Sequence, residues 1–162
     1  MRKLILIFLC AVVASCSKME TSAPDAMFEA PVITGYKLMD INASSLGKVG
    51  NPNVKTEMNS GGVLYRMIVY PIPAINFIAL HIDAPKDGTD RQIWIKRAQT
   101  NGTFSDNFNF GTLNMNANGN VFDTTITENQ LSIMGTRFPK GYYRMYVSVS
   151  GHTLYENIVI NN

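Results

Sequence analysis

The sequence predicts an all-β protein, an antiparallel immunoglobulin-like β-sandwich of about seven or eight strands that follows a signal peptide and a flexible tether. Three observations support this prediction. Short alternations of apolar and polar residues recur between turn residues, asparagine is frequent, and residues that favour helices are sparse. Both cysteines, Cys10 and Cys16, precede the region with these alternations. The fold is therefore expected to depend on packing and hydrogen bonds without disulfides or a cysteine metal site.

The N-terminus has the pattern of a secretory signal. Arg2 and Lys3 precede an apolar run over residues 4–13, which is too short to span a membrane. The run ends in Val13-Ala14-Ser15-Cys16, which resembles the lipobox of bacterial lipoproteins. That resemblance implies cleavage before Cys16 and acylation of its thiol and new amino group, so Cys16 is the predicted lipid-attachment residue. The alternative is an ordinary secretory signal with a chance cysteine.

The chain divides into three predicted parts: a lipoprotein signal peptide over 1–15, a lipidated flexible tether over 16–30, and a β-sandwich domain over 31–162. Without Arg2 and Lys3, the 14 basic residues fall to 12 and equal the 12 acidic ones. A near-neutral chain without charge runs excludes a basic nucleic-acid footprint and a polybasic membrane patch. Ser17 follows the cysteine in place of the aspartate that retains lipoproteins at the inner membrane, so the expected location is the outer membrane, in either leaflet.

Eight segments alternate as strands do, and turn residues separate them. Residues 44–62 are rich in Gly, Asn and Ser and are expected to form a long loop. Residues 85–88 are expected to turn the chain between two of the strands. The predicted strands cover residues 32–41, 63–70, 78–83, 93–96, 113–117, 121–127, 143–149 and 154–160.

Two motifs and a hairpin give the region from about 63 to 160 a resemblance to a known family. The motifs are Tyr70-Pro71-Ile72-Pro73-Ala74 and Phe138-Pro139-Lys140-Gly141-Tyr142-Tyr143, and the hairpin joins 144–149 to 154–160. Together they resemble the type A C-terminal sorting domain of type IX secretion substrates in the Bacteroidetes, although Ile72 replaces the family's asparagine. The resemblance implies a β-sandwich in a Bacteroidetes envelope protein. We do not extend the family's role in export to this chain, because a lipid-anchored protein has little need of a C-terminal sorting domain.

The residues that could carry chemistry are few. His81 and Asp83 alternate with apolar residues, so they share one strand face, where an imidazole–carboxylate pair could hold a metal or orient a histidine. The expected alternative is a solvated strand face. No Gly-x-Ser-x-Gly elbow or glycine-rich phosphate loop is present. We therefore expect no catalytic residues, no cofactor and no metal, and a hydrolase with dispersed carboxylates is the remaining enzyme hypothesis.

Aromatic residues supply the candidate contact surface, because large rings bind partners at low entropic cost. The alternative for the phenylalanines is that they plug an open end of the sandwich. Thr124, in Asp123-Thr124-Thr125, resembles the short O-glycosylation signal of this phylum. The candidate partner-binding residues are Trp94, Phe104, Phe108, Phe110, Tyr146 and Tyr155.

These features predict a non-catalytic outer-membrane lipoprotein that acts as an interaction or accessory subunit of a cell-envelope protein assembly. Its expected partners are the membrane, through the lipid on Cys16, and another envelope protein. A module that binds a small molecule or a glycan is the alternative. The segment from 103 to 120, with Trp94, would supply that site, and a concave aromatic-lined pocket there would favour it.

Overall fold

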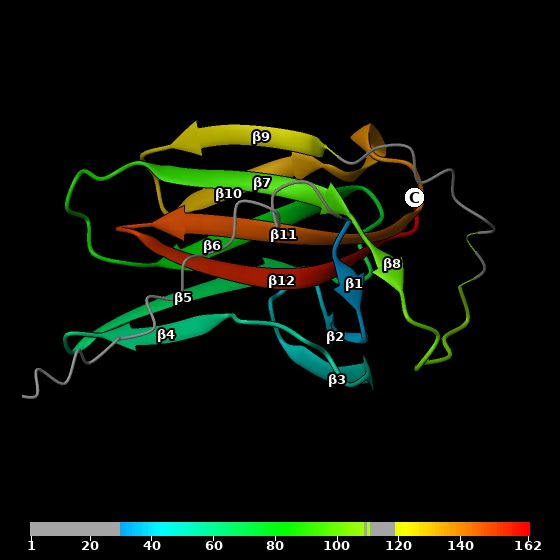
Figure 1. The fold of residues 1–162 in the computed structure, drawn as a ribbon. Helices are drawn as coiled ribbons and strands as arrows, with labels where there is room; N and C mark the ends of the chain where they lie inside the picture. The colour runs from blue at the N-terminus through cyan, green and yellow to red at the C-terminus, as the bar shows by residue number, and fades with distance from the viewer. Residues whose placement is uncertain (1–29, 109, 111–118) are drawn as a thin grey trace, which may run out of the picture.

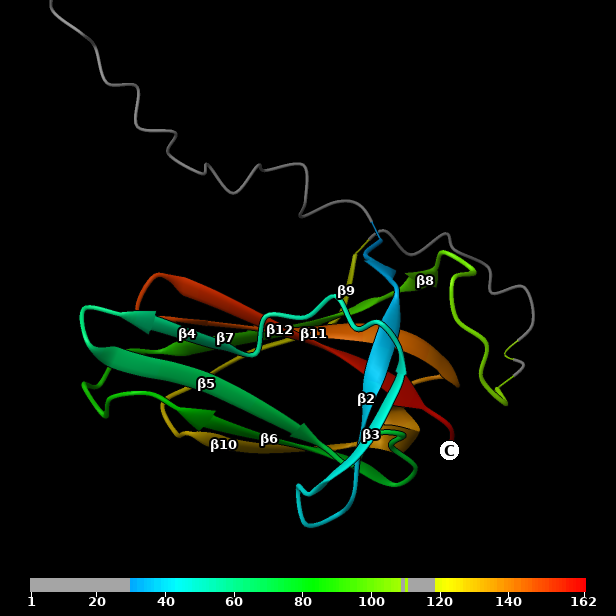
Figure 2. The ribbon, with the colours of Figure 1, turned by 90° about the horizontal axis from the view of Figure 1, so that it is seen from below.

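The computed structural model describes residues 30–108, 110 and 119–162, and it confirms an all-β antiparallel sandwich (Figures 1 and 2). Two four-stranded sheets form its layers. One has the order β10(Gln130–Met134)-β6(Phe77–Asp83)-β5(Val63–Tyr70)-β4(Glu57–Ser60). The other has the order β12(His152–Ile160)-β11(Gly141–Val149)-β7(Arg91–Arg97)-β9(Asn120–Ile126). The immunoglobulin-like variant of this architecture stays a prediction.

The core lies between the two sheets, where the central strands bury every second residue. In β5 the buried residues are Tyr65, Met67 and Val69, and in β11 they include Met145 and Val147. Apolar side chains from both layers meet there and exclude water, which is the main stabilising contribution to a sandwich. The outward faces of the same strands carry the polar and aromatic side chains that form the candidate sites.

Two smaller pairs complete the fold. β1(Val32–Ile33) runs parallel to β8(Gln99–Thr100), and β2(Gly35–Met39) pairs with β3(Ser45–Gly50) as an antiparallel ribbon. A 3-10 turn, η2(Gly135–Arg137), joins β10 to β11. Residues 30–108, 110 and 119–162 contain no helix that is long and apolar enough to cross a membrane.

Three sequence expectations differ from the structure. Residues 44–62 contain β3 and β4, so the prediction of a continuous loop was wrong, because pairing with β2 and β5 stabilises a segment of low intrinsic strand preference. Residues 32–41 form two strands that pair with different partners, not one. Strand β10 was not predicted at all. The predicted strand over 113–117 lies outside the described residues.

The expected turn over residues 85–88 connects the two sheets of the sandwich, because β6 and β7 belong to different sheets. The Arg91 side chain is only 1% exposed and organises this crossing. Its Nε donates to Asn129 Oδ1 at 2.9 Å, and its other nitrogens donate to the carbonyls of Thr89 and Pro85. One buried guanidinium therefore ties the loop after β6 to the turn before β10.

Candidate functional site

Three aromatic side chains form a continuous row on the outward face of the β12-β11-β7 sheet. Trp94 is paired with Tyr146 in the strand register, and Tyr146 is paired with Tyr155. The Trp94 and Tyr146 rings are parallel within 3° with centroids 5.1 Å apart, and the Tyr146 and Tyr155 centroids are 5.8 Å apart. All three are half-buried. We call these three residues the aromatic row.

The stacking determines what the aromatic row can bind. Parallel rings 5.1 Å apart must overlap, so Trp94 and Tyr146 cover part of each other's faces. A sugar that stacks flat needs an open ring face, whereas a protein surface can pack against ring edges and hydroxyls. Burial raises the pKa of Tyr146 although Arg144 opposes the shift, so its hydroxyl is protonated at neutral pH. The geometry therefore suits an apolar protein contact with a few polar partners.

Charged groups border the aromatic row at both ends. Asp123 is paired with Trp94 across β9, and the Arg144 guanidinium lies 4.9 Å from the centre of the Tyr155 ring. The backbone of Lys55 exchanges two hydrogen bonds with Tyr155, of 2.9 and 2.8 Å, and covers the open edge of β12. An apolar centre with a polar border is the usual composition of a protein–protein interface.

Next to the aromatic row, a polar network centred on the buried Asn157 and Arg144 holds the first described strand. Asn157 is fully buried; its Oδ1 accepts from Arg144 Nε at 2.8 Å and its Nδ2 donates to the Gly35 carbonyl at 2.7 Å. Asn53 Oδ1 accepts from Arg144 Nη2 at 2.9 Å, and Asn53 Nδ2 donates to the Val32 carbonyl at 2.9 Å. These bonds fix the point at which the chain enters the domain.

The three candidate phenylalanines lie together around Tyr142, near the start of β11. Phe108 stacks on Phe110 at 5.3 Å, and Phe104 and Phe110 both make edge contacts with Tyr142. All three are half-buried and pack against the core. This placement favours the alternative in which they close an end of the sandwich. Among the described residues, the ring contacts of the phenylalanines are with one another, Tyr36 and Tyr142, whereas Trp94 contacts Tyr146. The six candidate residues therefore form two clusters.

Asp106 holds the phenylalanine segment in place. Its carboxylate accepts from Tyr36 Oη at 2.9 Å, from Tyr142 Oη at 2.9 and 2.8 Å, and from the Phe108 amide at 3.0 Å. Burial first, and then the bond to Asp106, raises the pKa of both tyrosines far above the usual value. Sequence reasoning missed Asp106, although it is the only acidic residue between 101 and 118.

A small pocket opens beside this carboxylate. Its volume is about 320 Å³, at the lower limit for ligand pockets. Aromatic rings and a carboxylate in one concave site form the pattern that would favour the glycan alternative. It is lined by Tyr36, Leu38, Val49, Pro73, Ser105, Asp106, Asn107 and Phe108.

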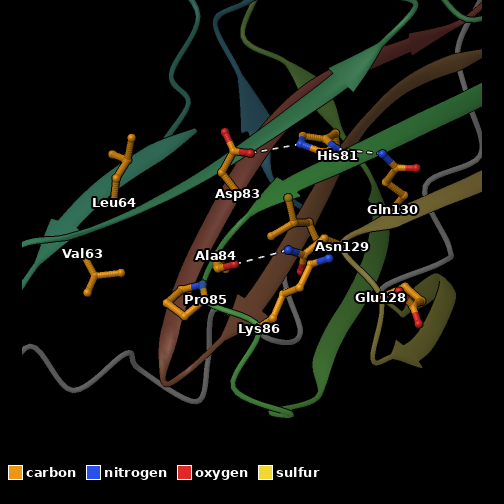
Figure 3. A pocket seen from close by; sticks show the side chains of 11 residues that line it. Val63, Leu64, His81, Asp83, Ala84, Pro85, Lys86, Glu128, Asn129 and Gln130 are labelled. Carbon is orange, nitrogen blue, oxygen red and sulfur yellow. Dashed lines mark hydrogen bonds and ion pairs between the residues drawn. The ribbon is translucent and has the colours of Figure 1, made fainter.

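His81 and Asp83 lie in a third place, an open cleft of about 970 Å³ lined by the start of β5, the end of β6, residues 84–86 and residues 128–130 (Figure 3). His81 Nε2 is 3.0 Å from Asp83 Oδ1, and His81 Nδ1 is 3.3 Å from Gln130 Nε2. Arg66 Nε donates to Asp83 at 2.8 Å, and this bond lowers the pKa of Asp83. Both ring nitrogens of His81 therefore lie within hydrogen-bonding distance of a side-chain partner.

The same cleft offers little to a metal. Among the residues that the structure describes, no group of three His, Cys, Asp or Glu side chains could hold an ion. Thr124, the candidate glycosylation residue, is half-buried and paired with the fully buried Ile93, so it shares the inward face of edge strand β9. Cys16 lies outside the described residues.

Comparisons with known proteins add no relative. No protein-family model, no curated protein and no solved structure matches this chain. Its candidate function must therefore be argued from its own residues.

Proposed function

We propose that this chain is a Bacteroidetes outer-membrane lipoprotein that acts as a non-catalytic interaction or accessory subunit of a cell-envelope protein assembly. The observation that carries this proposal is the aromatic row. Trp94, Tyr146 and Tyr155 are half-buried in the isolated chain and are bordered by Asp123 and Arg144. A partner that covers the row would desolvate rings that are already fixed in place, which keeps the entropic cost of binding low.

The aromatic row predicts the outcome of affinity purification from detergent-solubilised membranes. Replacing Trp94 and Tyr155 together by alanine removes both ends of the row and is expected to weaken capture of the partner at least tenfold, about 1.4 kcal/mol. The matched control is Tyr70→Ala, a half-buried tyrosine on the other sheet, which is expected to leave capture unchanged. Recovery of the wild-type protein without any partner would contradict the proposal.

A glycan or small molecule is the second candidate, and the pocket beside Asp106 favours it. Two variants distinguish the candidates, because Phe108 lines that pocket and does not belong to the aromatic row. A Phe108→Ala variant that loses retention on an oligosaccharide column, beside a Trp94→Ala variant that keeps it, would select the glycan function. The reverse pattern in protein capture would select the proposed function.

Anchoring by lipid is a separate part of the proposal. In cells fed labelled palmitate, we expect label on the wild-type chain and none on Cys16→Ser, with that variant leaving the membrane fraction. Cys10→Ser is the matched control, because it changes the other cysteine within the signal segment. It should be labelled and anchored like the wild type. A Cys16→Ser chain that stays membrane-bound would refute the anchor.

A further inference from the structure

Strand β10 is the least protected border of the sandwich. Among the described residues its strand partner is β6 alone, and the sheet ends there (Figure 2). Border strands usually avoid pairing with other chains by carrying charges, proline or bulges. β10 reads Gln-Leu-Ser-Ile-Met and pairs with β6 without a register shift, so it has none of these features.

The other three borders are protected. β4 has only four residues and begins with the charged Glu57. β9 carries Asp123, and its pairing with β7 contains a register shift. The border at β12 is covered by backbone hydrogen bonds from Lys55 and Ala74. The contrast singles out β10 as the border on which another strand can be added.

The register identifies which backbone groups of β10 point outward. Ile82 N donates to the Asn129 carbonyl, and Gly135 N donates to the Asn76 carbonyl, both at 2.8 Å. These bonds lie at the two ends of the β10–β6 ladder and follow its register, in which hydrogen-bonded pairs alternate. Leu131 and Ile133 therefore bond to β6. The N–H and C=O groups of the residues between them point away from the sheet: Gln130, Ser132 and Met134.

We propose that β10 pairs with β10 of a second copy of this chain, antiparallel and centred on Ser132. In this register Ser132 faces Ser132 of the other copy, and Gln130 faces Met134. All six outward N–H and C=O groups of each copy then find partners. The strand is self-complementary, because in this register no charged residue of one copy faces the same residue of the other copy.

Charges at the two ends of β10 also favour pairing with a second copy of this chain. Glu128 precedes the strand and Arg137 follows it, and both are exposed. Antiparallel pairing brings Glu128 of one copy beside the end of β10 in the other copy, where Arg137 lies. The contact is small, so association in solution is expected to be weak, and anchoring both copies in one membrane would raise their effective concentration. This inference does not depend on the aromatic row.

Cysteine cross-linking tests the register in the full chain with Cys10 and Cys16 changed to alanine. Ser132→Cys places two sulfurs opposite each other, at a Cα separation that a disulfide can bridge. Gln130→Cys, the matched control, places the two cysteines about 14 Å apart along the strands, so they cannot bond. We expect a disulfide-linked dimer with Ser132→Cys alone. Equal cross-linking of both variants, or none at 132, would overturn the inference.

Sedimentation equilibrium supplies the second test. Ser132→Lys puts two ammonium groups at the axis and is expected to weaken self-association at least tenfold, whereas Asn59→Lys, on the opposite border strand β4, leaves it unchanged. Near-UV circular dichroism checks that both variants are folded. A wild-type chain that stays monomeric, including one whose β10 binds a foreign protein instead, would refute the self-pairing.

Discussion

Replacing Lys37 by methionine is expected to destabilise the domain by about 3 kcal/mol at neutral pH. Lys37 Nζ lies 2.8 Å from Glu156 Oε2, and the Glu156 side chain is only 4% exposed while that of Lys37 is 35% exposed. Removing one partner leaves a buried carboxylate without its ion-pair partner, which typically costs 3–5 kcal/mol. The partial exposure of Lys37 places the expected loss at the low end of that range, because solvent screens the pair. Urea denaturation measures it.

The pH dependence of this loss identifies its cause. Burial raises the pKa of Glu156 above its ordinary value, although Lys37 opposes the shift. A raised pKa stabilises the folded state below the unfolded pKa, and this stability is lost as the pH rises through the folded value. Without Lys37 the pKa rises further, so the destabilisation should be larger at pH 7 than at pH 4. An equal loss at both pH values would contradict this explanation.

Two variants act as controls for Lys37→Met. Lys48→Met changes the exposed cross-strand neighbour of Lys37 and should cost little. The double variant Lys37→Met/Glu156→Leu removes both charges and is expected to recover most of the stability, since replacing a buried ion pair by apolar residues is often nearly neutral.

Replacing Asp106 by alanine is expected to cost about 3 kcal/mol and to release the phenylalanine segment. The carboxylate accepts bonds from Tyr36, Tyr142 and the Phe108 amide, and bonds to a charged group are each worth about 1.5–3 kcal/mol without being additive. Denaturation should show the loss, and proteolysis between 101 and 110 should become faster. Asp87→Ala, an exposed aspartate bonded to its own turn, is the control and should change neither.

Titration in alkali gives an independent readout of the Asp106 contact. Because the pKa values of Tyr36 and Tyr142 are raised, the folded state keeps both protons above pH 10, where an unfolded tyrosine ionises. The stability is therefore complete below pH 10 and falls as the pH rises further. Asp106→Ala should make this fall less steep, and an unchanged slope would show that burial alone causes the shifts.

The sequence predicts the strands whose apolar and polar side chains alternate strictly. It does not predict the strands whose conformation depends on pairing with a neighbouring strand. β5 and β11 bury every second residue, so their period is visible without a structure. β3 is exposed along almost its whole length, and β10 has five uncharged residues without a strong β-branched pattern. Their strand conformation depends on β2 and β6, which one segment of sequence does not reveal.

In the candidate site, too, the sequence predicts the features that follow from local alternation and misses those that depend on the assembled fold. The aromatic row follows from alternation, because Trp94 and Tyr146 stand opposite the buried faces of β7 and β11. Their stacking requires the strand register, which no local pattern specifies. Asp106 is separated by 70 residues from Tyr36 and by 36 from Tyr142, so its role depends on the assembled fold. Separations of that size explain why the carboxylate was not predicted.

The network around Asn157 has a consequence for the direction from which a partner can approach. Arg144 and Tyr146 are two residues apart on β11, so the tie to Val32 and the aromatic row occupy the same side of the sheet. If the chain is anchored at Cys16 as proposed, the anchored part joins the domain near Val32, on the same side of the sheet as the proposed binding surface. A partner resident in the same membrane would then meet the aromatic row on the side of the domain that carries the anchor.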